Sequence, residues 1–257
     1  MNRSRVAIEV ATPPRSPSSG SSAKEAVKKR SPTLRFVAPA PVQSESFKLV
    51  SAIDLTSYGT SGHEMVTIEV IDADGYWKTF TFHKCYICHY SPFFYAAFNG
   101  RFSEGASQSM VHNTVSIEAF GIFATWIYNQ KIEDSAGEIP CIKDLANLWI
   151  VADVFLIPAL QNMCVEALND QFSKVDFLPT LLFGHVYEHT KEDSPLRRMF
   201  VDLCLAHESK IQMEDNYPPQ MLVDIANASK DGKPSKSTKL SKDRIKKYFV
   251  SGDAPGQ

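Results

Sequence analysis

Residues 82–98 read FHKCYICHYSPFFYAAF, and this stretch decides the fold class. Its centre predicts a helix boundary, because Ser91 is a favoured N-cap residue and Pro92 suits the first position of a helix. The residues before the boundary, 83–90, are predicted to form one short helix, and those after it a second that ends at Asn99-Gly100. The apolar stripe of the second helix consists of Phe94, Ala97 and Phe98.

Two alternating segments precede this stretch and predict a β-hairpin. Residues 65–71 and 76–82 each alternate apolar and polar side chains, which is the pattern of a strand with one buried face. The Asp74-Gly75 pair between them suits the positive φ of a tight turn. The side chains predicted to point inward are Val66, Ile68, Val70, Phe80 and Phe82.

After the second helix, the sequence predicts one more short strand and then helices only. The strand is placed at 114–117, and the first long helix at 118–129, where apolar residues recur at helical spacing. A small sheet flanked by a cluster of helices is an α+β layout. Further helices are predicted at 141–155, from Pro158 onwards, at 176–190, and from Ser194 as N-cap to about residue 207.

The net charge of −2 of this 257-residue chain hides a strong segregation. Residues 1–45 and residues 228–257 each hold eight Lys or Arg against three acidic residues, and the part between them carries a net charge of −12. An acidic middle repels phosphates, so nucleic-acid binding is not expected. Both basic ends have the Ser-rich, Lys-rich composition of disordered segments and are predicted to be disordered tails, with a transient helix expected at residues 241–250 of the second one.

The sequence predicts an intracellular protein without a membrane span. No signal-peptide h-region is visible near the N-terminus, and no run approaches the roughly 20 apolar residues that a spanning helix needs. The cluster Lys28-Lys29-Arg30 is a weak nuclear-import signal, so cytoplasm and nucleus both stay open. The five cysteines are expected to be free thiols rather than a disulfide framework.

Four segments in order and spacing resemble the BTB/POZ family of protein-interaction domains. The resemblance implies the BTB/POZ fold for residues 62–170. A later run, 186–198, contains VYEHT and SPLRR and resembles the fungal branch, whose members add a helical extension, here 171–227. The four segments are Phe82-His83-Lys84; Ser91-Pro92 through Phe98; Glu118-Ala119-Phe120 with Trp126-Ile127-Tyr128; and Leu148 through Asp153 with Ile157-Pro158-Ala159-Leu160.

Most motif residues are interpreted as structural. His83 stands where a strand becomes a helix and can bond the free backbone groups there. Asp153 follows an apolar helix and is expected to bond a neighbouring group. The full structural set is His83, Lys84, Ser91, Pro92, Phe94, Asp153 and Pro158.

The candidate binding residues are Phe102 and Glu104. In cullin-binding members of the family, the loop after the second helix carries a hydrophobic-x-Glu motif whose apolar residue inserts into the cullin, and Phe102-Ser103-Glu104 stands at that place. Tyr128 matches a family position near the same surface. An aromatic anchor beside a charge is a plausible hot spot. The alternative is that Phe102 covers the core edge and Glu104 is solvated.

The sequence Cys85-Tyr86-Ile87-Cys88-His89 has the spacing of a haem-attachment site or half a zinc site. Neither is expected, because there is no export route for haem attachment and no second Cys-x-x-Cys pair for zinc. Cys88 is interpreted as a small buried apolar residue. Without a nucleophile elbow, P-loop or dinucleotide fingerprint, neither an enzyme nor a cofactor is expected.

The sequence is compatible with two functions. The first is a protein-interaction module that serves as a substrate adaptor of a cullin-RING ubiquitin ligase, with proteins, a cullin among them, as partners. The second is a nuclear, transcription-associated BTB scaffold without catalytic activity. Many family members exchange an N-terminal helix and strand to form a dimer, but residues 46–61 are short and weakly periodic. Homodimerisation therefore stays open.

Overall fold

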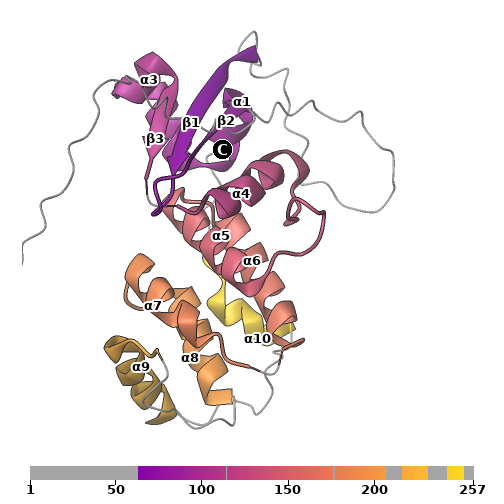
Figure 1. Ribbon diagram of the computed structural model, residues 1–257, viewed down its shortest axis with the longest axis vertical. Coiled ribbons are helices and arrows are strands. Elements are labelled where there is room, and N and C mark those ends of the chain that lie inside the picture. Colours follow the sequence, from indigo (N-terminus) through magenta and orange to yellow (C-terminus); the bar gives the residue numbers. More distant parts are fainter. Residues whose placement is uncertain (1–62, 114, 176, 207–215, 231–241, 252–257) are drawn as a thin grey trace, which may run out of the picture. The chain divides into compact units, whose positions relative to one another are not determined.

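The computed structural model describes residues 63–113, 115–175, 177–206, 216–230 and 242–251 (Figure 1). The basic segment 1–45 that was predicted to be disordered, the cluster Lys28-Lys29-Arg30 and residues 46–61 lie outside the described residues. The described residues form a small three-stranded sheet and a cluster of helices, so the predicted α+β class is confirmed.

The predicted hairpin forms the centre of the sheet. Strand β1 (Met65–Ile71) pairs antiparallel with β2 (Trp77–His83), with Ile68 opposite Phe80. Asp72 closes the turn, because its Oδ1 accepts the backbone N–H groups of residues 74 and 76 at 3.1 and 2.9 Å, and Gly75 takes a φ of +79°. The predicted inward side chains are all buried: Val66, Ile68, Val70, Phe80 and Phe82.

The third strand is not where the sequence predicted it. The sequence placed this strand at 114–117, but strand β3 is Ser109–His112, which pairs parallel with β1. Ser116 instead caps helix α4 (Ile117–Asn129), since its hydroxyl accepts the Ala119 N–H at 3.3 Å. Ser116 and Ile117, which were predicted to lie in a strand, therefore form the start of α4. The order of the strands in the sheet is β2-β1-β3.

Two short helices follow the hairpin as predicted, α1 (Lys84–Tyr90) and α2 (Pro92–Asn99). Ser91 joins them and is fully buried. Its hydroxyl accepts the Phe94 N–H at 3.1 Å and donates to the carbonyl oxygen of Phe155 at 2.6 Å. One side chain thus caps α2 and also ties it to the end of a helix far along the chain.

Replacing Ser91 by alanine is expected to lower the free energy of unfolding by about 1–3 kcal/mol, because it removes an N-cap and leaves buried backbone groups unpaired. Urea unfolding followed by circular dichroism measures the change. Ser116→Ala is the matched control, because it removes a cap from a partly exposed site and should cost about 1 kcal/mol or less. Equal losses for both variants would show that the bond to Phe155 contributes nothing.

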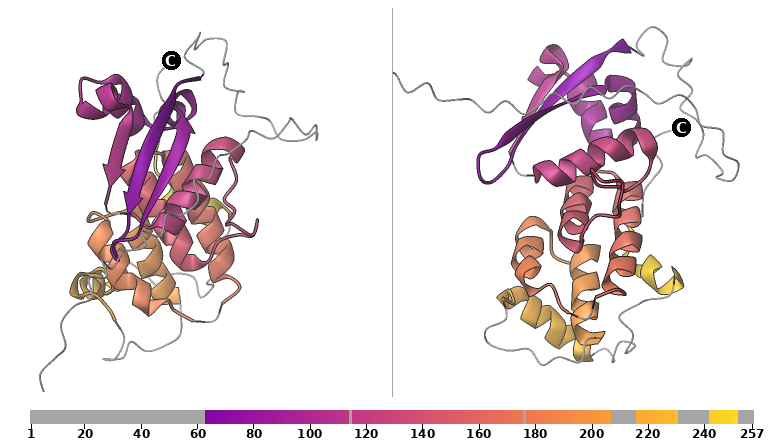
Figure 2. Two further views of the ribbon diagram at one scale, coloured as in Figure 1. Left: turned by 45° about the horizontal axis from the view of Figure 1, so that its top comes forward. Right: turned by 45° about the vertical axis from the view of Figure 1, so that its right-hand side comes forward.

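The core lies between the inner face of the sheet and helices α4, α5 (Ile142–Val154) and α6 (Pro158–Phe172). Figure 2 shows these helices gathered on one side of the sheet. All residues of α5 from Leu145 to Ala152 are buried, so this helix is the centre of the cluster rather than a surface helix. The largest fully buried side chains in this part are Trp126, Trp149, Phe94, Phe98, Phe120, Phe123 and Phe155.

A helical extension follows α6. It consists of α7 (Thr180–His189), α8 (Pro195–Ala206) and α9 (Pro219–Lys230), and α7 begins four residues later than the predicted start at 176. His185 of α7 lies 2.6 Å from the Oδ1 of Asn147 on α5, which joins the extension to the core. As predicted, Ser194 stands at the N-cap position before the first residue of α8, and its carbonyl oxygen accepts the Arg198 N–H at 3.1 Å. Its buried hydroxyl has no hydrogen-bond partner among the described residues.

From residue 228 onwards the sequence predicted disorder with only a transient helix at 241–250, whereas residues 242–251 hold a helix and a 3-10 turn that pack on the domain. Helix α10 (Lys242–Ile245) and a 3-10 turn (Lys246–Tyr248) pack on the helices, with Ile245 and Tyr248 buried. The Asn162 amide exchanges two hydrogen bonds with the backbone of Val250, at 3.1 and 2.7 Å. The Asp202 carboxylate accepts from the Tyr248 hydroxyl and from Lys247, both at 2.6 Å. Composition alone misses these specific contacts.

Candidate protein-interaction surface

Phe102 begins helix α3 (Ser103–Ser107) and leaves 63 % of its surface exposed. Its carbonyl oxygen accepts the Gly105 N–H at 3.1 Å, which forms the first turn of α3. Glu104 is half-buried, and its Oε2 accepts the Ser103 hydroxyl at 2.9 Å. The predicted anchor is therefore an exposed aromatic ring and does not cover the core edge, and the carboxylate lies within the same helical turn.

The loop before Phe102 requires glycine. A Cβ atom at Gly100 would lie 2.3 Å from the carbonyl oxygen of Ala96 and 3.0 Å from the Phe102 ring, so any other residue would force the loop to move. Gly100 has a φ of −81°, which any residue can adopt. The close approach of the Ala96 carbonyl oxygen to Gly100, with the Phe102 ring also nearby, is what selects this glycine.

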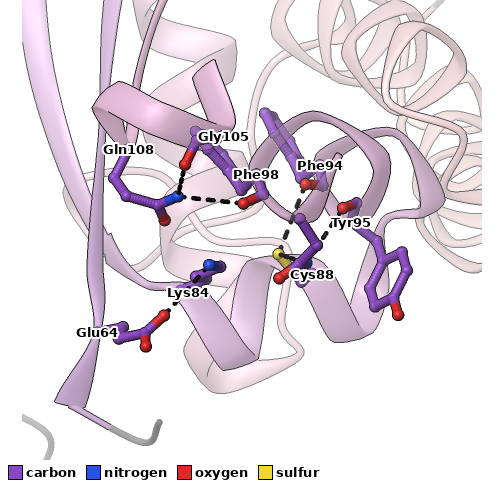
Figure 3. A network of polar contacts seen from close by, with 9 residues as sticks. Glu64, Lys84, Cys88, Phe94, Tyr95, Phe98, Gly105 and Gln108 are labelled. Carbon is purple, nitrogen blue, oxygen red and sulfur yellow. Dashed lines mark hydrogen bonds and ion pairs between the residues drawn. The ribbon is translucent and has the colours of Figure 1, made fainter. Parts of the chain in front are cut away.

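Polar contacts beneath the loop hold α3 to α2 (Figure 3). The Gln108 amide nitrogen donates to the carbonyl oxygens of Phe98 and Gly105, at 3.1 and 2.5 Å. Gln108 reaches them from the left-handed conformation that ends α3, with a φ of 51°. Nearby, the Cys88 thiol donates to the Phe94 carbonyl oxygen at 3.6 Å. The exposed Phe102 ring thus stands on a base that hydrogen bonds fix in place.

Tyr128, the third predicted binding residue, belongs to a different cluster. Its hydroxyl accepts the His83 backbone N–H at 3.0 Å and lies 3.2 Å from His83 Nδ1. Its ring stacks on Phe82, with centroids 6.5 Å apart, and contacts Tyr86. Burial raises the pKa of Tyr128, so the hydroxyl remains a neutral hydrogen-bonding group. Tyr128 closes the junction of β2, α1 and α4.

This contact also corrects the expected role of His83. Its side chain was expected to bond the free backbone groups at the start of α1, but it makes no cap hydrogen bond there. The other motif residues occupy structural places. Lys84 forms an ion pair with Glu64 at 3.2 Å, Asp153 accepts from the Gln161 amide at 3.1 Å, and Pro158 is the first residue of α6.

The Cys-x-x-Cys-His stretch lies within α1, with Cys85 and Cys88 buried. Burial raises the pKa of both thiols, that of Cys88 to about 11, and a protonated thiol is a poor metal ligand. Within the described ranges no group of three or more His, Cys, Asp or Glu side chains is arranged to hold a metal ion. None of the helices described is long and apolar enough to cross a membrane.

The sequence reasoning missed an apolar groove at the start of the extension. A cavity of about 830 Å³ lies between the beginning of α5, the end of α6 and the connection into α7. Phe177 and Leu181 at this groove are 59 % and 84 % exposed. Large exposed apolar side chains are typical of interaction surfaces. The lining residues are separated in the sequence, and only the apolar residues Phe177 before α7 and Leu181 in its first turn could have hinted at the groove.

Comparisons with known proteins agree with this arrangement. Residues 65–172 match the family model of the BTB/POZ domain. The Kelch repeat and BTB domain-containing protein 8 of Danio rerio is 21 % identical over 145 residues, which cover 55 % of this chain and 23 % of that protein. The protein of the same name from Rattus norvegicus is also 21 % identical over 145 residues and is covered to 24 %. The matched region is thus about a quarter of the length of these curated relatives.

Proposed function

Residues 65–172 form a BTB/POZ domain, a protein-interaction module, and we propose that this chain is a substrate adaptor of a cullin-RING ubiquitin ligase. In this proposal, Phe102 inserts into the N-terminal helical domain of a cullin and Glu104 contacts its rim. BTB domains are generally non-catalytic, so in this proposal the chain acts by holding a substrate protein close to the cullin. The names of the two relatives, which pair a BTB domain with kelch repeats, fit a role in assembly.

The observation that carries the proposal is the exposed ring of Phe102 beside a hydrogen-bonded backbone turn. Binding energy at interfaces concentrates in a few aromatic or Arg anchors that enter pockets of the partner. An anchor that is already fixed in the free protein loses little conformational entropy when it binds. Phe102 is exposed, and the Gln108 amide holds the backbone of the α3 turn next to it, so the backbone of the anchor is already in place.

The proposal predicts saturable binding of the full chain to a cullin N-terminal domain, measured by surface plasmon resonance. Phe102→Ala should weaken this binding by about tenfold or more, the size expected for a hot-spot residue. Tyr76→Ala is the matched control, because Tyr76 is 71 % exposed in the β1–β2 turn, and it should bind as the unchanged chain does. Absence of binding by the intact chain, or full binding by Phe102→Ala, would overturn the proposal.

A further inference from the structure

A second pocket lies between β2, α4, the loop that follows α4 and the start of α5. Its volume is about 540 Å³. Phe80, Ile117 and Ile122 form an apolar floor, and four carboxylates stand among the lining residues. We call it the acid-rimmed pocket; its carboxylates are those of Glu118, Glu133, Asp134 and Asp144.

The rim has an excess of negative charge. Glu118 accepts a hydrogen bond from the Ser116 hydroxyl, Asp144 one from the Cys141 thiol, and Asp134 two from backbone N–H groups of its own loop. These donors are neutral, and within the described part of the chain none of the three carboxylates forms an ion pair. Glu133 has a cation nearby, Lys131, at 3.7 Å. The middle of the chain also carries a net charge of −12, so the surrounding field favours a positively charged occupant.

Lys78, the single cation among the lining residues, indicates how such an occupant would be held. Its Nζ lies 5.2 Å from the centroid of the Phe80 ring, which is a cation–π arrangement on the floor of the pocket. A Lys or Arg side chain combines an apolar stem with a charged head. The apolar floor of the pocket suits the hydrocarbon stem of such a side chain, and the carboxylates of the rim suit its positively charged head.

Gly121 keeps the pocket open. It lies in the middle of α4, where glycine is less favourable than alanine, and a Cβ atom there would meet nothing within 4 Å. Packing therefore does not require this glycine, in contrast to Gly100. The missing side chain leaves the helix surface bare where the pocket is lined by α4.

We propose that the acid-rimmed pocket binds a Lys or Arg side chain presented by an extended, basic segment of a partner protein. The stem would lie over Phe80 and Ile122, and the cationic head would face Glu133 and Asp144. Charge complementarity supports this occupant and disfavours a nucleic acid or an anionic membrane, whose phosphates the rim would repel. This site is separate from Phe102, so it does not depend on cullin binding.

The test uses the full chain and a fluorescein-labelled ten-residue peptide of alternating Arg and Ala, followed by fluorescence anisotropy. Gly121→Leu should fill the pocket and weaken peptide binding about tenfold, the loss expected when an anchor loses its pocket. Its thermal midpoint should not fall, because leucine is the better helix former. Gly184→Leu is the matched control: Gly184 lies in α7, also with nothing within 4 Å of its Cβ position, and should bind normally.

Charge variants test the rim independently. Glu133→Gln should weaken binding about threefold, which corresponds to one exposed ion pair, and Lys78→Gln should strengthen it, because the competing ammonium is removed. A peptide with Gln in place of Arg should not bind. Unchanged affinity in Gly121→Leu, or equal binding of the neutral peptide, would overturn the proposal. A tenfold gain in affinity after deletion of residues 1–45 would assign the pocket to a basic segment of this chain and overturn the partner assignment.

Discussion

Replacing Phe155 by alanine is expected to lower the free energy of unfolding by about 3–5 kcal/mol, the usual effect of emptying a buried aromatic site. Phe155 follows α5 and has no exposed surface. Its ring centroid lies 4.5 Å from that of Phe94, 5.7 Å from that of Phe123 and 5.9 Å from that of Phe120. Deleting the ring removes contacts with α2 and α4 together, and those helices cannot both close the gap.

The loss is large against the roughly 5–15 kcal/mol that stabilises most domains. Urea unfolding followed by tryptophan fluorescence is a suitable measurement, since Trp126 and Trp149 are buried in the same core. Phe177→Ala is the matched control, because Phe177 is 59 % exposed and its removal should change stability by no more than about 0.5 kcal/mol. Similar urea midpoints for the two variants would show that the surrounding side chains fill the space of the Phe155 ring without a loss of stability.

Replacing Arg197 by methionine is expected to cost about 2–4 kcal/mol and to loosen the helical extension, because buried acceptors lose their donor. Arg197 on α8 is 8 % exposed. Its Nε donates to the Thr190 hydroxyl at 2.9 Å, and its Nη2 donates to the carbonyl oxygens of Tyr187 and Thr190 at the end of α7. The guanidinium also lies 4.4 Å from the centroid of the Tyr187 ring. Methionine keeps the apolar stem but satisfies none of the carbonyls.

Hydrogen exchange distinguishes a local effect from a global one. Amides of α7 should lose protection in Arg197→Met, while those of β1 should change less, because β1 belongs to the sheet and not to the α7–α8 contact. Arg198→Met is the matched control, since the neighbouring Arg198 is exposed, and it should leave both regions unchanged. Equal loss of protection in α7 and β1 would mean that domain and extension unfold as one unit.

Local sequence patterns predicted those elements whose signal lies within a few residues. The alternation in 65–71 and 76–82 predicted the hairpin, and the Ser91-Pro92 pair predicted the boundary between α1 and α2. Helical spacing predicted α4 to within one residue at its start. The interactions that decide these elements are a turn, a helix cap and a buried helix face. Each of them connects residues that are close in the chain.

The sequence by itself therefore determined the fold class, the hairpin and the helices α1, α2 and α4 to α8, whereas α3 and α9 were not predicted. Tertiary structure alone decided that β3 is Ser109–His112, because parallel pairing with β1 joins segments far apart in the chain. It also decided that the basic segment 242–251 is ordered, through contacts of Val250 with Asn162 and of Tyr248 with Asp202. The acid-rimmed pocket has the same origin, since β2, α4 and α5 each supply part of its lining. Periodicity reports which face of an element is buried, but not which distant element covers it.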